Sequence, residues 1–293
     1  MARKWIRILS WSAVVLVLLV TALLVHLYLE GRPAQGRPQY VAMGSSFAAG
    51  PAISEAAADS PWFCARSRDN YAQQLARLRG LSLVDVSCGG ATSRHLLDGG
   101  QWMQPAQIAA VTPDTELVTI TIGGNDIAYI GQLMARACGD STPWLQRRLG
   151  GCKLRSVAQM QQGLVGLQQQ LLAVIAELRR RAPQARIVLL TYQSVLPESG
   201  SCERLALGTA QADEMRGIAS QLAETTRAAA AQGGASVMDA SRLTQGHDAC
   251  ADEPWMNGMY PAGGLLGAPL HPTIEGMTAI AQALDRLLNA DTP

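Results

Sequence analysis

The sequence has almost no net charge and no stretch dominated by charge of one sign. Its 293 residues carry 24 Lys and Arg against 23 Asp and Glu, which leaves a net charge of +1, and the two signs are interspersed. Nucleic-acid-binding domains usually present a basic stripe, so a nucleic-acid partner is not expected. An acidic tail, which would indicate an interaction segment, is missing as well.

Metal-ligating and redox spacings are also missing. None of the six cysteines forms a C-x-x-C pair, which excludes a zinc ribbon and a redox dithiol. The groups near residue 250 that resemble metal ligands lack the H-x-x-H spacing of a helical site, and a solvated loop explains them better: His247, Asp248, Asp252 and Glu253. We therefore expect no metal and no cofactor.

The cysteines that are present predict disulfides. Their number is even, and all follow an apolar N-terminal segment, as in a domain exported to an oxidising compartment. Sequence alone leaves the connectivity open. We prefer the sequential order because each bond then closes a local loop: Cys64 with Cys88, Cys138 with Cys152, and Cys202 with Cys250.

The N-terminus carries the longest apolar run. Ile8 to Leu29 contain no charge and follow Arg3, Lys4 and Arg7. As a helix this run would span about 33 Å, enough for a bilayer core. Residues 1–30 are predicted to be a single-pass membrane anchor with a cytoplasmic N-terminus, residues 31–39 a linker, and residues 40–293 an extracytoplasmic domain. The alternative is a cleaved signal segment, which would leave a secreted domain. Nothing indicates an obligate oligomer, so we expect a monomer.

Short apolar runs alternate with helical patterns through the rest of the chain. Five runs predict strands, at 40–43, 83–86, 117–122, 186–191 and 235–238. Helical patterns cover 70–79, 157–181, 209–232 and 274–288, with a further segment near 105–110. The alternation predicts an α/β domain with a central parallel sheet of about five strands, covered by helices on both faces. Two segments fit this pattern poorly, 133–156 and 241–269, and are expected to be excursions from the core.

Three of the expected strands end in residues that suit catalysis. The first is followed by Ser46, the second by Gly90 and the third by Asn125. The carboxyl ends of parallel strands line a crevice, where a serine can attack, a glycine exposes backbone N–H groups, and an asparagine amide faces developing negative charge. Each residue taken alone is more often part of an ordinary turn or helix cap.

A general base is found by elimination. Of four histidines, His26 lies in the apolar segment, His95 at an expected helix start, and His247 in a polar loop. His271 stands between two prolines just before the last helix, and these restrict the backbone around it.

Together these residues resemble the four blocks of the SGNH hydrolase family, also known as GDSL esterases and lipases. Gly44-Ser45-Ser46-Phe47 is similar to the first block, with Ser45 in place of its Asp. Gly90 matches the second block, Gly123-Gly124-Asn125-Asp126 the third, and His271-Pro-Thr the fourth. The Gly-Ala-Thr run at Gly90 is similar to the actinobacterial secreted branch.

The resemblance implies a three-layer α/β/α, flavodoxin-like fold and acyl transfer to water. Ser46 would be the nucleophile, His271 its base, and Ser46, Gly90 and Asn125 the oxyanion hole. The family's Asp three residues before the His is replaced here by Ala268. We expect the Ala268 main-chain carbonyl to orient His271 in a Ser–His dyad; Asp248, Asp252 or Glu253 would instead complete a triad.

The sequence indicates the substrate less directly than it indicates the catalytic residues. An acyl pocket would be apolar, and several large side chains are candidates, although packing in the core or in the disulfide loops explains most of them better: Trp102, Met103, Trp144, Trp255, Met256 and Tyr260. A carboxylic ester, small or lipidic, is the expected substrate class. A cell-surface carbohydrate deacetylase or acyltransferase is the alternative, and a non-catalytic binding module is the second alternative.

Overall fold

The domain is built on one parallel sheet, in the computed structural model that describes residues 2–30, 36–139, 144–260 and 268–290. The strand order is β2-β1-β3-β4-β5, and every neighbouring pair is parallel. The strands are β1 (Tyr40–Gly44), β2 (Leu83–Asp85), β3 (Leu117–Thr121), β4 (Arg186–Leu190) and β5 (Ser236–Met238). Each predicted strand is present to within two residues at either end, because buried strands of a parallel sheet are nearly continuous apolar runs.

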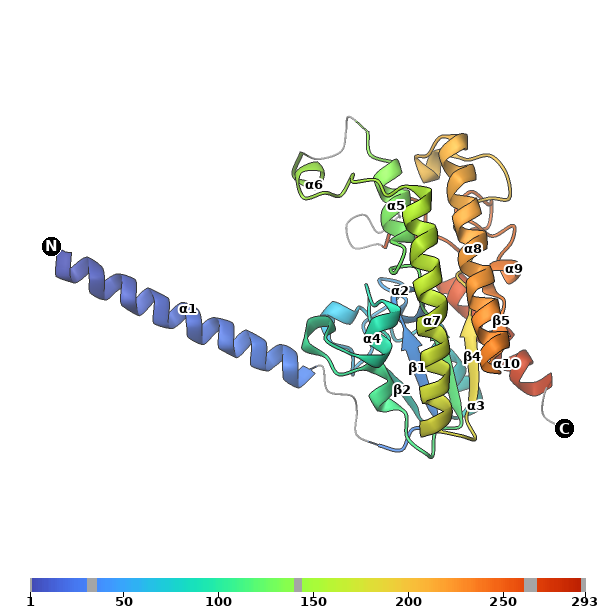
Figure 1. Ribbon diagram of the computed structural model, residues 1–293, viewed down its shortest axis with the longest axis horizontal. Coiled ribbons are helices and arrows are strands. Elements are labelled where there is room, and N and C mark those ends of the chain that lie inside the picture. The colour runs from blue at the N-terminus through green and yellow to red at the C-terminus, as the bar shows by residue number, and fades with distance from the viewer. Residues whose placement is uncertain (1, 31–35, 140–143, 261–267, 291–293) are drawn as a thin grey trace.

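Helices cover both faces of this sheet (Figure 1). Val41 and Met43 of β1 face one apolar cluster, while Tyr40 and Ala42 face the other, as alternation along a strand requires. The first cluster is covered by α4 (Ser93–Leu97), α5 (Tyr129–Arg136), α7 (Val157–Arg181) and α8 (Thr209–Gly233). The second is covered by α3 (Tyr71–Arg79) and α10 (Ile274–Ala290). The three-layer α/β/α arrangement predicted from the sequence is confirmed.

Local signals explain where the main helices begin and end. The side chain of Asn70 accepts from Gln73 N–H at the start of α3, and Ser156 forms a capping box with Gln159 at the start of α7. Gly80 and Gly234 end α3 and α8 in the left-handed conformation. Short helices fill the connections: α2 (Ser46–Ala49), η1 (Trp62–Cys64), η2 (Gln101–Met103), η3 (Gln107–Ala110), α6 (Trp144–Arg148), η4 (Glu203–Leu205) and α9 (Ala240–Leu243).

Three disulfides join Cys64 to Cys88, Cys138 to Cys152 and Cys202 to Cys250. This is the sequential order preferred from the sequence. The first bond ties η1 to the segment that follows β2, and the third ties η4 to the loop after α9.

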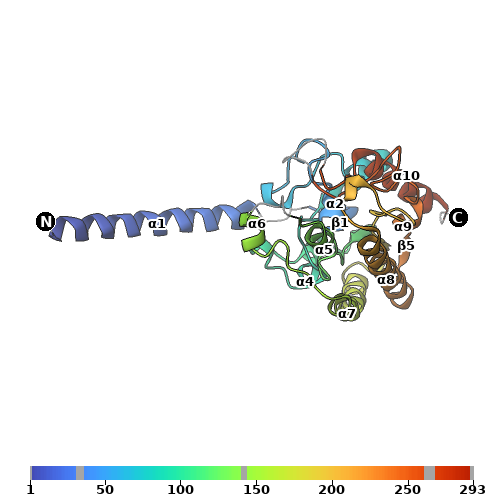
Figure 2. The ribbon, with the colours of Figure 1, turned by 90° about the horizontal axis from the view of Figure 1, so that it is seen from above.

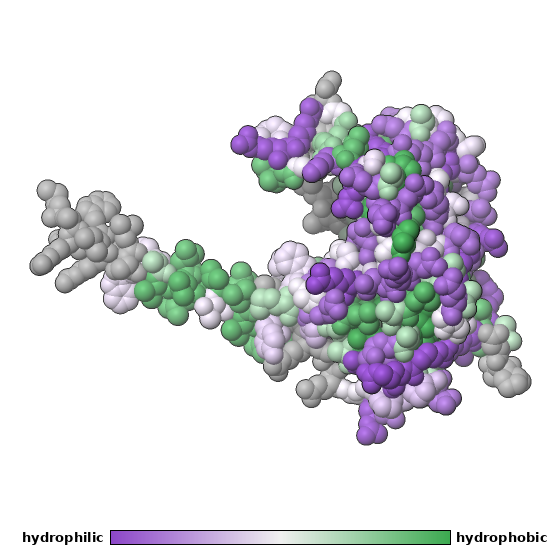
Figure 3. All heavy atoms as spheres, viewed as in Figure 1, coloured by the Kyte–Doolittle hydropathy of each residue, from purple (hydrophilic) through white to green (hydrophobic). Residues whose placement is uncertain are grey.

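The N-terminal helix α1 (Ala2–Glu30) projects from the domain (Figures 1 and 2). Its surface is a run of apolar side chains, seen in green in Figure 3 and exposed at Val17, Leu18 and Leu19 among others. Among the described residues no helix combines the length and the apolar character that a bilayer crossing needs, so the predicted transmembrane anchor is not supported.

Candidate active site

The loops that follow the strands meet at the carboxyl edge of the sheet. Because all five strands are parallel, Ser46 after β1, Gly90 after β2 and Asn125 after β3 leave the sheet at the same edge. His271 comes from the segment just before α10. Ser46 and His271, which are 225 positions apart in the sequence, are therefore in direct contact.

Ser46 stands on a turn that only glycine permits at its start. Gly44 has φ +139°, and a Cβ there would lie 2.3 Å from the carbonyl oxygen of Thr121. Ser45 N–H donates to that same carbonyl, at 2.9 Å, so β1 and β3 hold the turn from one side. From the other side the buried amide of Gln107 donates to Gly44 O and accepts from Gly44 N–H, at 3.0 and 2.8 Å.

The imidazole of His271 is held at both nitrogens. Its Nε2 lies 2.7 Å from Ser46 Oγ, and its Nδ1 lies 2.7 Å from the carbonyl oxygen of Pro269. A carbonyl can only accept, so Nδ1 carries the proton and the neutral ring presents the lone pair of Nε2 to the serine hydroxyl. This is the arrangement that proton removal from Ser46 requires.

The expectation that Ala268 supplies the orienting carbonyl is wrong. Leu270 adopts φ +57°, a left-handed conformation, and the turn it makes brings the carbonyl of Pro269 to Nδ1. The Ala268 carbonyl instead accepts from Asn257 Nδ2, at 3.3 Å.

Groups of the preceding loop contact neighbours within that loop. Asp248 accepts from Cys250 N–H, and the carbonyl of Glu253 lies 2.9 Å from Nδ1 of His247, whose ring stacks on Trp255. Within the described part of the chain no carboxylate is hydrogen-bonded to His271. The loop supports His271 through its backbone, because Asn257 N–H donates to His271 O at 2.9 Å.

Burial lowers the pKa of His271 below its ordinary value of 6.5, and the hydrogen bond to Pro269 opposes that shift. Desolvation disfavours the charged imidazolium, so the ring is neutral, and thus able to accept a proton, at neutral pH.

Gly90 and Asn125 lie on the two loops beside the serine turn. Asn125 Nδ2 donates to the carbonyl of Ala91, at 2.9 Å, which joins the β3 loop to the β2 loop. Gly90 is exposed and has φ +80°. The neighbouring Gly89 is fixed through both of its backbone groups, because the Gly89 N–H donates to Cys64 O and the Gly89 carbonyl accepts from Gln101 Nε2. These contacts fix the conformation of the two loops that carry Gly90 and Asn125.

A further tie between the two loops was not found from the sequence. The carboxylate of Asp126 accepts from both the N–H and the hydroxyl of Ser93, at the start of α4. Burial raises the pKa of Asp126, while the bonds from Ser93 lower it. The sequence alone does not indicate which distant residue meets this acid.

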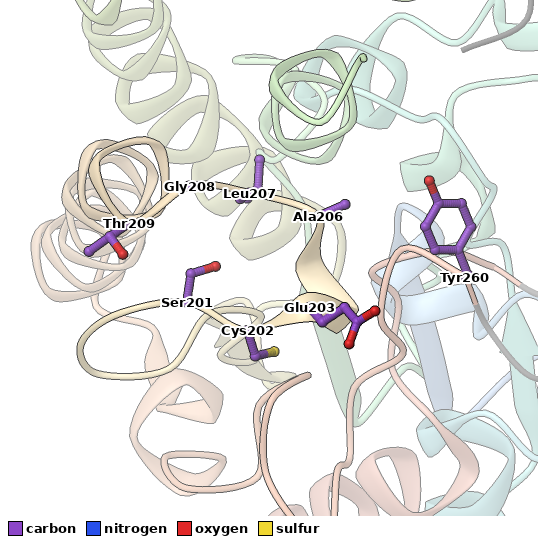
Figure 4. Close-up of a pocket in the computed structure, with 8 residues that line it drawn as sticks. All are labelled: Ser201, Cys202, Glu203, Ala206, Leu207, Gly208, Thr209 and Tyr260. Carbon is purple, nitrogen blue, oxygen red and sulfur yellow. The ribbon is translucent and has the colours of Figure 1, made fainter. Parts of the chain in front are cut away.

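The proposed pocket residues are dispersed. Trp102, Met103 and Trp144 are exposed, Met256 is buried in the core, and Trp255 stacks on His247. Tyr260 faces the segment 201–209 across an open pocket of about 530 Å³ (Figure 4). Ser46 and His271 do not line that pocket, so its residues are not assigned to the acyl site.

Comparison with known proteins links this geometry to ester hydrolysis. Residues 42–279 match the model of the GDSL-like lipase/acylhydrolase family. Lipase 2 of Streptomyces coelicolor is 32% identical over 273 residues, covering 88% of this chain and 89% of that protein. An extracellular lipase from Streptomyces rimosus superposes with a TM-score of 0.68 at 25% identity, covering 86% of this chain and 99% of that one. A phospholipase A1 from Streptomyces albidoflavus, 23% identical, shares the fold with a TM-score of 0.69 over 86% and 98% of the two chains.

Proposed function

Because this chain belongs to the GDSL-like lipase/acylhydrolase family and is a carboxylic ester hydrolase, we propose that it cleaves esters through a Ser46–His271 dyad and a covalent acyl-enzyme. The observation that carries this proposal is the 2.7 Å contact between Ser46 Oγ and His271 Nε2, with Nδ1 on the carbonyl of Pro269.

In the first half of the reaction Ser46 Oγ attacks the ester carbonyl carbon while its proton moves to His271 Nε2. The carbonyl oxygen becomes an oxyanion, and the backbone N–H groups of Ser46 and Gly90 and the amide of Asn125 stabilise it. Loss of one such donor typically lowers turnover about 10²–10³-fold. The tetrahedral intermediate collapses when the C–O bond to the alcohol breaks and the alcohol takes the proton from Nε2.

In the second half a water molecule takes the place of the alcohol. His271 Nε2 accepts its proton, the hydroxide attacks the acyl carbon, and collapse releases the acid and returns the proton to Ser46 Oγ. The imidazolium formed in each half is stabilised by the dipole of the Pro269 carbonyl rather than by a full negative charge. We propose that the enzyme acts as a monomer, because the Ser46–His271 contact forms within a single chain.

We place the enzyme outside the cytoplasm and assign it lipid or short-chain esters. Three disulfides support an oxidising compartment. The lipase relatives support a lipid ester, and no geometric observation favours acetylated carbohydrate over it. A panel of p-nitrophenyl esters, a phospholipid and an acetylated sugar separates these substrates. Activity on the sugar with none on p-nitrophenyl butyrate would assign a carbohydrate deacetylase instead.

The test of the dyad is Ser46→Ala. We expect hydrolysis of p-nitrophenyl butyrate to fall by about 10³-fold or more, because the attacking oxygen is lost, and labelling by a fluorophosphonate probe to disappear. Asp252→Asn and Glu253→Gln are the matched controls, since neither carboxylate contacts His271. If Ser46→Ala kept its turnover, the nucleophile assignment would be wrong. If either acid variant lost activity while folded, a triad would replace the dyad.

A further inference from the structure

A buried tyrosine joins the nucleophile turn to the loop that carries Asn125. Tyr192 follows β4, on the strand end that the four-residue catalytic set does not use. Its hydroxyl lies 2.9 Å from Ser45 Oγ and accepts from Gly124 N–H, also at 2.9 Å. Ser45 directly precedes Ser46, and Gly124 directly precedes Asn125. One oxygen atom therefore bridges the residues next to the nucleophile and next to the oxyanion donor.

The ring of Tyr192 extends the same connection to the base. Its centroid lies 4.4 Å from that of Phe47, and Phe47 lies 5.2 Å from the ring of His271. Tyr192 is 6% exposed and Phe47 is 3% exposed, so these rings are held by packing on all sides. Tyr192 thus contacts the residues that precede Ser46 and Asn125, and it reaches His271 through Phe47.

The chain makes room for this ring at one position. A Cβ on Gly124 would lie 2.6 Å from Cε1 and 2.7 Å from the hydroxyl oxygen of Tyr192. Only glycine at position 124 lets the Tyr192 phenol approach the backbone closely enough to accept a hydrogen bond from the N–H of residue 124. Burial raises the pKa of Tyr192 to about 12, so the hydroxyl stays neutral and can donate and accept at once.

We propose that Tyr192 is a positioning residue that sets the distance between the Ser46 hydroxyl and the Asn125 amide. The inference rests on the proposed function, because it assigns to Tyr192 the placement of those two groups. Ser45, which stands where the family's first block has Asp, takes part in this positioning. Its short hydroxyl group contacts Tyr192, which follows strand β4.

The test is Tyr192→Phe, which keeps the ring and removes the bridging oxygen. We expect kcat to fall about tenfold or more and KM to change less than about twofold, because displacement of catalytic groups raises the barrier without removing a substrate contact. The affinity for a boronic acid, which forms a tetrahedral adduct on serine, should fall in proportion to kcat/KM. Tyr40→Phe is the matched control, because it removes a buried hydroxyl that bonds Thr119 at the opposite end of β1.

Two further variants locate the effect. Gly124→Ala displaces the same ring and should reproduce the loss of kcat. In an Asn125→Ala background the loss caused by Tyr192→Phe should shrink, because one of the positioned groups is gone. Wild-type kcat in Tyr192→Phe, an equal loss in Tyr40→Phe, or a rise in KM alone would overturn the inference. If Ser46→Ala remained active, the proposed function itself would fail, whatever Tyr192→Phe did.

Discussion

In the proposed mechanism a single imidazole determines the pH range in which the enzyme works. His271 would have to be neutral to take the proton of Ser46, and its Nδ1 partner is a carbonyl of Pro269 rather than a carboxylate. A carboxylate would stabilise the charged ring and raise its pKa. With a carbonyl in that place, burial prevails and the pKa of His271 is lowered from 6.5.

The pH dependence of kcat/KM follows from that direction. We expect the acid limb to have its midpoint below pH 6.5, with a plateau at neutral pH, because activity is lost only when the ring is protonated. The free energy of unfolding should depend on pH in the same direction. Because the pKa of His271 is lower in the folded state than in the unfolded chain, its contribution to stability is lost as the pH falls below the unfolded-state pKa. Initial rates on p-nitrophenyl butyrate between pH 4.5 and pH 8, restricted to the range where circular dichroism shows native protein, measure the midpoint. A midpoint above 6.5 would show that a negative charge does face His271.

At the residue scale, the sequence predicts that Ser46 and His271 meet but not what holds them in place. Ser46 and His271 were chosen by residue type and motif, and the structure brings them to 2.7 Å. The orienting carbonyl was assigned to Ala268 because the left-handed conformation of Leu270 has no signal in the sequence. Gln107 and Tyr192 were not found at all, because their partners lie 63 and 147 positions away.

At the scale of elements, the β2 loop depends on a covalent link. The Cys64–Cys88 bond stands beside Gly89, whose N–H donates to Cys64 O, and Gly90 is the next residue. The Cys138–Cys152 bond instead closes an excursion after α5. The two bonds span 24 and 14 positions, so the chain-entropy model gives each a similar stabilisation of about 3 kcal/mol.

Removing the two bonds separately should therefore have different consequences for catalysis. We expect both Cys64→Ser/Cys88→Ser and Cys138→Ser/Cys152→Ser to lose about 3 kcal/mol of unfolding free energy in urea. Only the first should lower kcat/KM, by about tenfold, because the Gly90 N–H, a proposed oxyanion donor, is then no longer held in place. Equal kcat/KM in the two double variants would contradict the role given to the β2 loop.

The elements themselves were largely predictable, and the reason is physical. Strands buried on both faces are continuous apolar runs, and capping residues such as Asn70 and Ser156 mark where helices begin. Short elements such as α5 and α6 were not predicted. α5 ends just before Cys138, and α6 lies between Cys138 and Cys152, where the chain is held by a disulfide rather than by a periodic pattern.

At the scale of the whole molecule, α1 lies outside the packed core of the domain, although it approaches the domain at η2. Two apolar clusters, one on each face of the sheet, make up the core of the described residues, and neither includes a side chain of α1. α1 leaves a continuous run of large apolar side chains exposed, which in soluble monomeric proteins is uncommon. The predicted boundary between an N-terminal segment and a domain from residue 40 thus stays a prediction that folding experiments can test.

A chain that begins at residue 37 should fold and work on its own. Because α1 adds nothing to either cluster, we expect its removal to change Tm by less than about 2 °C, which is no more than a loss of 1 kcal/mol causes in a domain of this size. The values of kcat and KM on a water-soluble ester should stay within about twofold, since no proposed catalytic group lies before Ser46. The truncated chain should also associate less at high concentration, because the apolar run is gone. Calorimetry, initial rates and analytical ultracentrifugation of both chains measure these quantities. If truncation lowered Tm strongly or abolished turnover of the soluble ester, α1 would be part of the folded unit and the domain boundary would have to move to the N-terminus.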